Sequence, residues 1–146
     1  MKIYTDGATS NNGYEGAQGG WAYILVNDHN QIVAQGSGSL PEATNNQCEM
    51  TALIQACKAA DHYEDIFDIY SDSAYCVNCF KERWYIKWLR NGWVNSKKEP
   101  VANKELWEQL IPYFQDPCYN FHKVQGHADD YWNNYVDRMA VEAKGK

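Results

Sequence analysis

The chain has 146 residues, of which 45% are hydrophobic, 14% aromatic and 22% charged. This length suits one domain whose core is large enough to fold without disulfide or metal support. Thirteen Lys and Arg against nineteen Asp and Glu give a net charge of −6. Taken alone, that charge argues against a nucleic-acid partner, because phosphate backbones attract basic proteins.

The charge is unevenly distributed along the chain. Residues 81–104 contain seven basic and two acidic residues, a net charge of +5, whereas the remainder contains six basic and seventeen acidic residues, a net charge of −11. Trp84, Trp88 and Trp93 lie among these cations, a combination typical of surfaces that contact nucleic acid. The alternative is that the rings pack against one another. We favour packing for Trp88 and Trp93, and nucleic-acid contact for Trp84.

Cellular location and cysteine chemistry follow from what the sequence lacks. No apolar run approaches the roughly 20 residues of a membrane span, and residues 1–6 predict a strand instead of an export signal. Five cysteines make a poor disulfide framework. We therefore expect a cytoplasmic protein without membrane contact. Cys76 and Cys79 have the spacing of a redox pair or half a zinc site, but no second pair completes one, which favours ordinary helix packing.

Hydrophobic periodicity and turn residues predict the elements in chain order. The first predicted strand begins at residue 3 and ends at Asp6, and the other four cover 21–26, 31–36, 66–70 and 119–124. A loop is predicted at 8–18 and a hairpin turn at 27–30. The predicted helices are one capped near Thr44 and running to about 60, one from about 74, one at 104–113, and a last one with Val136, Ala140 and Ala143 on one face. This order predicts an α/β fold, a mixed sheet with helices on its faces.

Three acidic residues lie where the pattern predicts burial. Asp6 and Asp72 each follow a strand, and Glu49 lies on the apolar stripe of the helix near 45–60. A carboxylate in such a position is costly unless it is paired or binds a metal. Asp72 alone is explained equally well as a turn or helix-cap residue, but Glu49 lies inside its helix. If strands one and four are neighbours, the three carboxylates converge and repel one another unless a divalent cation lies between them.

The ligand type narrows the choice of cation and chemistry. Oxygen ligands without His or Cys favour Mg²⁺ or Mn²⁺ over zinc, and Mg²⁺ usually shares its site with substrate phosphate oxygens. Asp137 lies next to the apolar Val136 on the last helix, so it joins the inner face as a fourth acid. His127 lies in a polar loop ten residues before it and is a candidate proton shuttle, because histidine titrates near neutral pH.

Four motifs, in chain order, resemble those of type 1 ribonucleases H of the bacterial or phage kind. They are IYTDGA at 3–8, TNNQCEM at 44–50, YSDS at 70–73 and VQGHA at 124–128, the last followed by Asp137. The match runs from residue 3 to about residue 143. The resemblance implies a ribonuclease H-like fold, with a five-stranded mixed sheet of order 3-2-1-4-5 flanked by helices. It also implies that residues 1–146 form a single catalytic domain with a basic aromatic protrusion at about 81–104.

The resemblance further implies an activity. The family hydrolyses the RNA strand of RNA–DNA hybrids with two divalent ions, Mg²⁺ with Mn²⁺ as a possible substitute, leaving 5′-phosphate and 3′-hydroxyl ends. Each matching residue takes a role from its motif. Asp6, Glu49, Asp72 and Asp137 would bind metal, His127 would assist proton transfer or product release, Asn12, Asn45 and Asn46 would contact the minor groove, and Thr44 and Asn103 would hold a DNA phosphate.

One departure from the family pattern concerns substrate binding. Glu42 stands where many members place a basic residue beside the DNA-phosphate pocket, and an acid there weakens phosphate binding. The loop at 8–18 is also longer than usual for the family. The minor-groove role is therefore assigned to Asn12 only to within one or two residues.

Two other functions compete with a hybrid-specific nuclease. One is a non-catalytic nucleic-acid-binding domain that keeps the fold, which four acids facing phosphates argue against. The other is a transposase, integrase or junction nuclease on the same fold, which lacks the TNN-x-x-E motif combined with the Gly-His loop. We expect the chain to act as a monomer.

Overall fold

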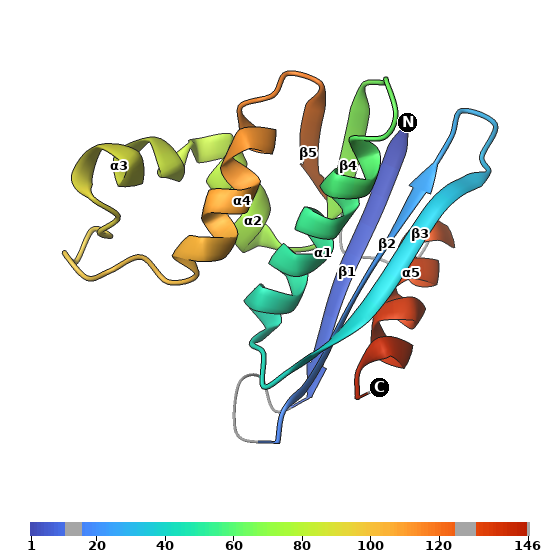
Figure 1. The fold of residues 1–146 in the computed structure, drawn as a ribbon, viewed down its shortest axis with the longest axis horizontal. Helices are drawn as coiled ribbons and strands as arrows, with labels where there is room; N and C mark the ends of the chain where they lie inside the picture. Colours follow the sequence, from blue (N-terminus) through green and yellow to red (C-terminus); the bar gives the residue numbers. More distant parts are fainter. Residues whose placement is uncertain (11–15, 125–130, 146) are drawn as a thin grey trace.

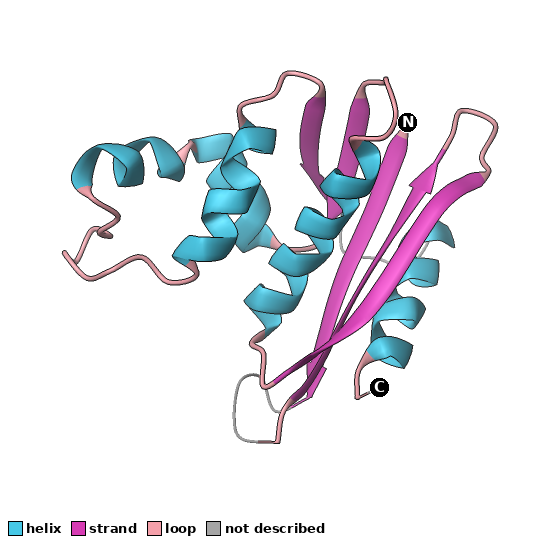
Figure 2. Ribbon diagram, viewed as in Figure 1, coloured by secondary structure: helices cyan, strands magenta, loops and turns pink. Residues whose placement is uncertain are grey.

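The computed structural model describes residues 1–10, 16–124 and 131–145. Its strands are β1 (Lys2–Ser10), β2 (Gln18–Val26), β3 (Ile32–Pro41), β4 (Phe67–Ser71) and β5 (Tyr119–Lys123). Its helices are α1 (Asn45–Ala60), α2 (Ala74–Glu82), α3 (Trp84–Asn91), α4 (Lys104–Phe114) and α5 (Tyr131–Ala143). Figure 2 shows one sheet with helices on both faces, which confirms the predicted α/β class. Within the described ranges, no helix is long and apolar enough to cross a membrane.

The sheet has the order β3-β2-β1-β4-β5, as the resemblance implied. β1 pairs antiparallel with β2, which in turn pairs antiparallel with β3. On its other side β1 pairs parallel with β4, which pairs parallel with β5. The pairing of β1 with β4 covers only residues 2–4 against 68–70 and stops at Tyr4 opposite Tyr70. β1 continues beyond that point to Ser10. The two central parallel strands therefore part just before Asp6.

Helices cover the two faces of the sheet unequally. The larger core lies between one face and α1, α2, α3 and α4, and the smaller core lies between the other face and α5 (Figure 1). Side chains alternate between faces along a strand, so Ile3 belongs to the larger core and Tyr4 to the smaller one. The same alternation places Asp6 on the face that α5 covers and Gly7 on the face of α1.

The basic aromatic segment forms a protrusion that extends away from the sheet, made of the end of α2, α3 and the connection to α4 (Figure 1). Trp88 stacks on Trp93 with ring centres 5.7 Å apart and contacts the fully buried Trp107 at 5.5 Å. Packing of Trp88 and Trp93 is therefore confirmed. The Lys104 Nζ lies 5.6 Å from the centre of the Trp93 ring, a cation–π contact that adds to the packing.

Strand boundaries near the first loop were predicted wrongly. Ala8, Thr9 and Ser10 continue β1 instead of forming loop, and they pair with residues 18–20 of β2. Asp6 consequently lies within β1, not after it. Glycine-rich sequence favours turns, but here the glycines allow close approach between elements, and the ladder continues through them.

The third strand also runs further than predicted, to Pro41. Gly36 and Gly38 lie beneath the rings of Tyr23 and Trp21 on β2, where an added Cβ would come within 2.6 Å of ring atoms. The two rings are themselves stacked, with an interplanar angle of 2°. Aromatic cover of strand glycines compensates for their missing side chains, so the strand continues beyond residue 36, where it was predicted to end.

Gly20 of β2 allows α5 to approach the sheet. A Cβ at this position would overlap the Ala140 carbonyl oxygen and lie 2.7 Å from the Lys144 backbone nitrogen. We expect Gly20→Ala to displace α5 and to lower the free energy of unfolding by about 1–3 kcal/mol, measured by urea denaturation. Ser37→Ala, at an exposed position on β3, is the matched control and should change stability by less than about 0.5 kcal/mol. Equal stability of the two variants would contradict this packing.

Candidate active site

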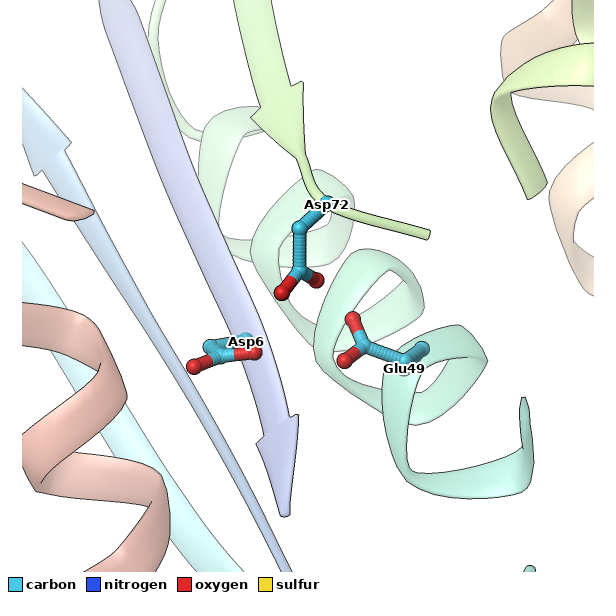
Figure 3. Close-up of side chains that lie close together, drawn as sticks. All are labelled: Asp6, Glu49 and Asp72. Carbon is cyan, nitrogen blue, oxygen red and sulfur yellow. The ribbon is translucent and has the colours of Figure 1, made fainter. Parts of the chain in front are cut away.

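Three carboxylates from different elements converge where β1 and β4 part. Asp6 comes from within β1, Glu49 from the second turn of α1, and Asp72 directly follows β4 (Figure 3). One carboxylate oxygen of each can be chosen so that all lie within 4.8 Å of one another. The structure thus brings together the three acids that the sequence singled out, across 66 positions of chain from Asp6 to Asp72.

Gly7 makes this convergence possible. Its backbone N–H donates to Asp6 Oδ1 at 2.9 Å and to Glu49 Oε1 at 3.2 Å. A Cβ at Gly7 would lie 2.6 Å from the Glu49 backbone nitrogen and 2.8 Å from Cys48 Cβ. Only glycine therefore lets α1 come close enough to β1 for the two carboxylates to share one donor.

Burial and mutual repulsion make the charged forms of two of these acids costly. Asp6 is 7% exposed and Glu49 4% exposed, whereas Asp72 is exposed. Burial raises the pKa of Asp6 to about 8, aided by a hydrogen bond with the Asp137 side chain and by the charges of Asp72 and Asp137. Burial and the charges of Asp72 and Asp6 raise the pKa of Glu49 well above its usual value. Without a cation, the cluster holds protons that ordinary carboxyl groups lose below neutral pH.

The cluster fits a hard divalent cation. Glu49 Oε2 is buried and has no hydrogen-bond partner among the described residues, although buried carboxylate oxygens are normally satisfied. A cation bound by these carboxylates would supply that missing partner and would neutralise their repulsion. The donor set consists only of carboxylate oxygens, which suits Mg²⁺ or Mn²⁺.

Asp137 approaches the cluster from the opposite face of the sheet. It is exposed on α5 between the buried Val136 and Ala140, and its carboxyl group is hydrogen-bonded to Asp6. Asp137 is not one of the three carboxylates that lie within 4.8 Å of one another, and it contacts that group through Asp6. The prediction that Asp137 joins the inner face was therefore only partly right, because Asp137 reaches Asp6 but is itself exposed. His127 and Asn12 lie outside the described residues, so their predicted roles remain predictions.

A second set of polar side chains surrounds the N-terminus of α1. Thr44 caps this helix, since its Oγ1 accepts from the Gln47 N–H at 3.1 Å, and Gln47 Oε1 accepts from the Thr44 N–H at 2.9 Å. Gln47 Nε2 donates to Asn103 Oδ1 at 3.3 Å. We call these three residues the Thr44–Asn103 pocket. Asn45 and Asn46 are exposed on the first turn of α1.

Sequence reasoning missed Gln47. The spacing Thr-x-x-Gln is a recognisable capping-box signature, so its contact with Thr44 had a signal in the sequence. Its contact with Asn103, 56 positions away, had none. Glu42, next to this pocket in sequence, is exposed and adopts a left-handed backbone with φ of 58°.

Trp84 lines a groove of about 570 Å³ on the protrusion, with Lys87, Trp88, Asn91, Val94, Asn95 and Ser96. Its ring is half-buried and contacts Trp88 and Tyr75 at 6.4 and 6.3 Å. The groove combines an aromatic wall with a cation and amide groups, the composition that suits a nucleic-acid backbone. Trp84 therefore both packs and faces a groove.

Cys76 and Cys79 serve as packing residues. Both are buried in α2 within the larger core, and neither forms a disulfide. Burial raises the pKa of each thiol to about 12, which keeps it neutral and weakly reactive. The interpretation of the CxxC spacing as ordinary helix packing is confirmed.

The chain is similar to known proteins over nearly its whole length. The RNase H family model matches residues 1–144. The ribonuclease H of Symbiobacterium thermophilum is 45% identical over 142 residues, covering 97% of this chain and 92% of that protein. The ribonuclease H of Thermoanaerobacter sp. (strain X514) is 41% identical over 142 residues, covering 97% and 88%. The foamy viral protease–reverse transcriptase, solved in complex with an RNA/DNA hybrid, matches at a TM-score of 0.82 and 23% identity, covering 97% of this chain and 19% of that one.

The raised pKa of Asp6 predicts how pH and metal affect stability. Without metal, the Asp6 carboxyl group keeps its proton to a higher pH in the folded chain than in the unfolded chain, so its contribution to stability falls as pH rises between about pH 4 and pH 8. Asp6→Asn removes the carboxylate but keeps an oxygen that can accept from Gly7. In EDTA at pH 8, we expect this variant to be more stable than the unchanged protein, by on the order of 1–3 kcal/mol. The difference should shrink toward pH 4 in denaturant titrations.

Added Mg²⁺ or Mn²⁺ should reverse this order, because cations stabilise the unchanged protein by binding its folded state. Asp28→Asn, in an exposed turn, controls for the loss of one carboxylate elsewhere. A cation effect that is equal in all three proteins would contradict a metal site at Asp6.

Proposed function

Because this chain belongs to the RNase H family and is an endoribonuclease, we propose that it hydrolyses the RNA strand of RNA–DNA hybrids at the Asp6–Glu49–Asp72 cluster. The observation that carries the proposal is the convergence of three carboxylates within 4.8 Å, with one buried oxygen of Glu49 unpartnered among the described residues. A domain that only bound nucleic acid would gain nothing from acids placed against phosphates. The family relationship argues against the transposase, integrase and junction-nuclease alternatives.

We infer that Asp6, Glu49, Asp72 and Asp137 hold two divalent ions, Mg²⁺ with Mn²⁺ as a possible substitute. Such ions, when bound, activate water and stabilise the leaving 3′-oxygen, which leaves 5′-phosphate and 3′-hydroxyl ends. The donor set and the raised pKa values of Asp6 and Glu49 support this inference. His127 is proposed to move a proton near the reacting phosphate, since an imidazole titrates near the working pH.

The remaining residues bind and orient the substrate in this proposal. Asn12, Asn45 and Asn46 contact minor-groove edges and 2′-hydroxyl groups, the features that distinguish RNA from DNA without reading sequence. Thr44 and Asn103 donate to a phosphate of the DNA strand. Their support is the joint anchoring of both side chains by Gln47.

The protrusion supplies a separate contact in this proposal. Trp84 offers an aromatic wall and Lys87 a cation along the groove, and both suit the backbone of the DNA strand. The net charge of +5 over residues 81–104 supports this assignment. Monomeric state and cytoplasmic location stay predictions from the sequence.

Cleavage of a uniform RNA–DNA hybrid tests the activity. With Mg²⁺ we expect cutting of the RNA strand only, and EDTA should abolish it. Asp72→Asn should reduce kcat by at least about 10²-fold, because it removes a carboxylate that stabilises charge at the reacting phosphate. Denaturing gels with either strand labelled measure this directly.

Parallel assays on double-stranded DNA and on a four-way junction separate the alternative nucleases on this fold. Cutting of either in preference to the hybrid, or identical behaviour of the unchanged protein and Asp72→Asn, would overturn the proposal. Tight hybrid binding that persists in EDTA with no cleavage under any metal would support a pure binding domain instead.

Replacement of the acidic Glu42 by a basic residue should raise the affinity for the hybrid. Because this exposed acid stands beside the Thr44–Asn103 pocket in the chain, Glu42→Arg replaces repulsion of a DNA phosphate by attraction. We expect KM for the hybrid to fall about 3- to 10-fold at low salt, and the dependence of log KM on log salt to steepen by about one. Glu64→Arg makes the same charge change beyond the other end of α1 and should leave the slope nearly unchanged. Equal slopes for the two variants would contradict phosphate binding at this pocket.

A further inference from the structure

The N-terminus of α4 has an unusual residue at its cap. Asn103 occupies the N-cap position with a left-handed backbone, φ 62°, and its side chain makes no capping hydrogen bond. Asparagine is among the strongest helix-capping residues, so its side chain forgoes a favourable local bond. That side chain instead accepts a hydrogen bond from Gln47 Nε2, on a different helix.

Gln47 uses both ends of its amide. Its oxygen accepts from the Thr44 N–H and its nitrogen donates to Asn103, while its own backbone N–H donates to Thr44 Oγ1. Two of these bonds lie within the N-terminal cap of α1, and the third joins this cap to the start of α4 through the half-buried Gln47 side chain. Residues so connected hold each other's side-chain orientation.

The direction of these bonds decides what the pocket presents. Because Asn103 Oδ1 accepts from Gln47, its Nδ2 points elsewhere, and no hydrogen bond within the described part of the chain uses it. Thr44 Oγ1 likewise accepts from Gln47, which leaves its hydroxyl hydrogen to donate. Each of these two side chains then has one hydrogen-bond donor available, the Asn103 Nδ2 and the Thr44 hydroxyl, beside the first N–H groups of α1, a set that suits an anion.

We propose that Gln47 is a positioning residue that fixes Asn103 and Thr44 as donors toward a phosphate of the DNA strand. This inference rests on the proposed function and adds a residue that the family motifs did not assign to substrate binding. Gln47 touches neither the phosphate nor the reacting atoms. Its loss should therefore weaken the grip on the hybrid and leave the chemical step unchanged.

Gln47→Met tests this without altering charge, because methionine is similar in length but neither donates nor accepts here. We expect KM for the hybrid to rise about tenfold while kcat stays within about twofold. Gln47→Glu separates the helix cap from the contact with Asn103, because glutamate is the usual capping-box partner but cannot donate to Asn103 Oδ1. Thermal stability should be higher in Gln47→Glu than in Gln47→Met, because the capping-box bond returns. KM for the hybrid should remain as high as in Gln47→Met.

A double-mutant cycle with Asn103→Ala provides the control. If Gln47 acts through Asn103, then Gln47→Met should raise KM by less than about twofold once Asn103 is already alanine. A full tenfold rise in that background, an unchanged KM in Gln47→Met, or a fall in kcat alone would each overturn the inference.

The same cycle measured as hybrid Kd in the Asp72→Asn background keeps binding separate from cleavage. Absence of cleavage by the unchanged protein defeats the proposed function. Absence of coupling between positions 47 and 103 in the Kd cycle defeats the inference about Gln47, whatever the cleavage assay shows.

Discussion

The repulsion among buried carboxylates is the constraint on which the rest of this structure depends. Asp6 and Glu49 lie almost wholly out of solvent, and the pKa of each is raised by burial and by neighbouring negative charge. Such a group destabilises the fold that creates it. The fold tolerates the arrangement because two cores, one on each face of the sheet, hold β1 between α1 and α5. Stability from packing is thus used to maintain a site that opposes folding.

The geometry of the sheet explains why the acids meet where they do. β1 and β4 pair for only three residues, and β1 then continues alone on that side. Alternation along β1 turns Asp6 toward α5 and leaves Gly7 facing α1, so acids can arrive from both faces of the sheet at one gap. The basic protrusion is attached to the same layer as α1. Trp84, proposed to bind substrate on the protrusion, and the helix that carries Glu49 therefore share one packed core.

The sequence predicted this site better than it predicted the strands. Glu49 stood out because a carboxylate on an apolar helical stripe has few structural explanations, and Cys76 and Cys79 were correctly taken as packing residues. Composition misled at the loop predicted over residues 8–18, because Ala8, Thr9 and Ser10 continue β1 and pair with residues 18–20 of β2. The link from Gln47 to Asn103 was beyond prediction, since it depends on how α4 docks against α1 and not on any local pattern.

Two residues with different proposed tasks lie a short distance apart on helix α1 and its cap. Thr44 begins the helix and Glu49 lies five residues later, a separation of about 7.5 Å along the axis at 1.5 Å per residue. If one strand is held at the first position and the other is cut at the second, the helix acts as a gauge across the groove between them. A duplex with a different groove width would present its phosphodiester out of reach, even with every contact residue intact. Selectivity would then reside in a length that no single side chain sets.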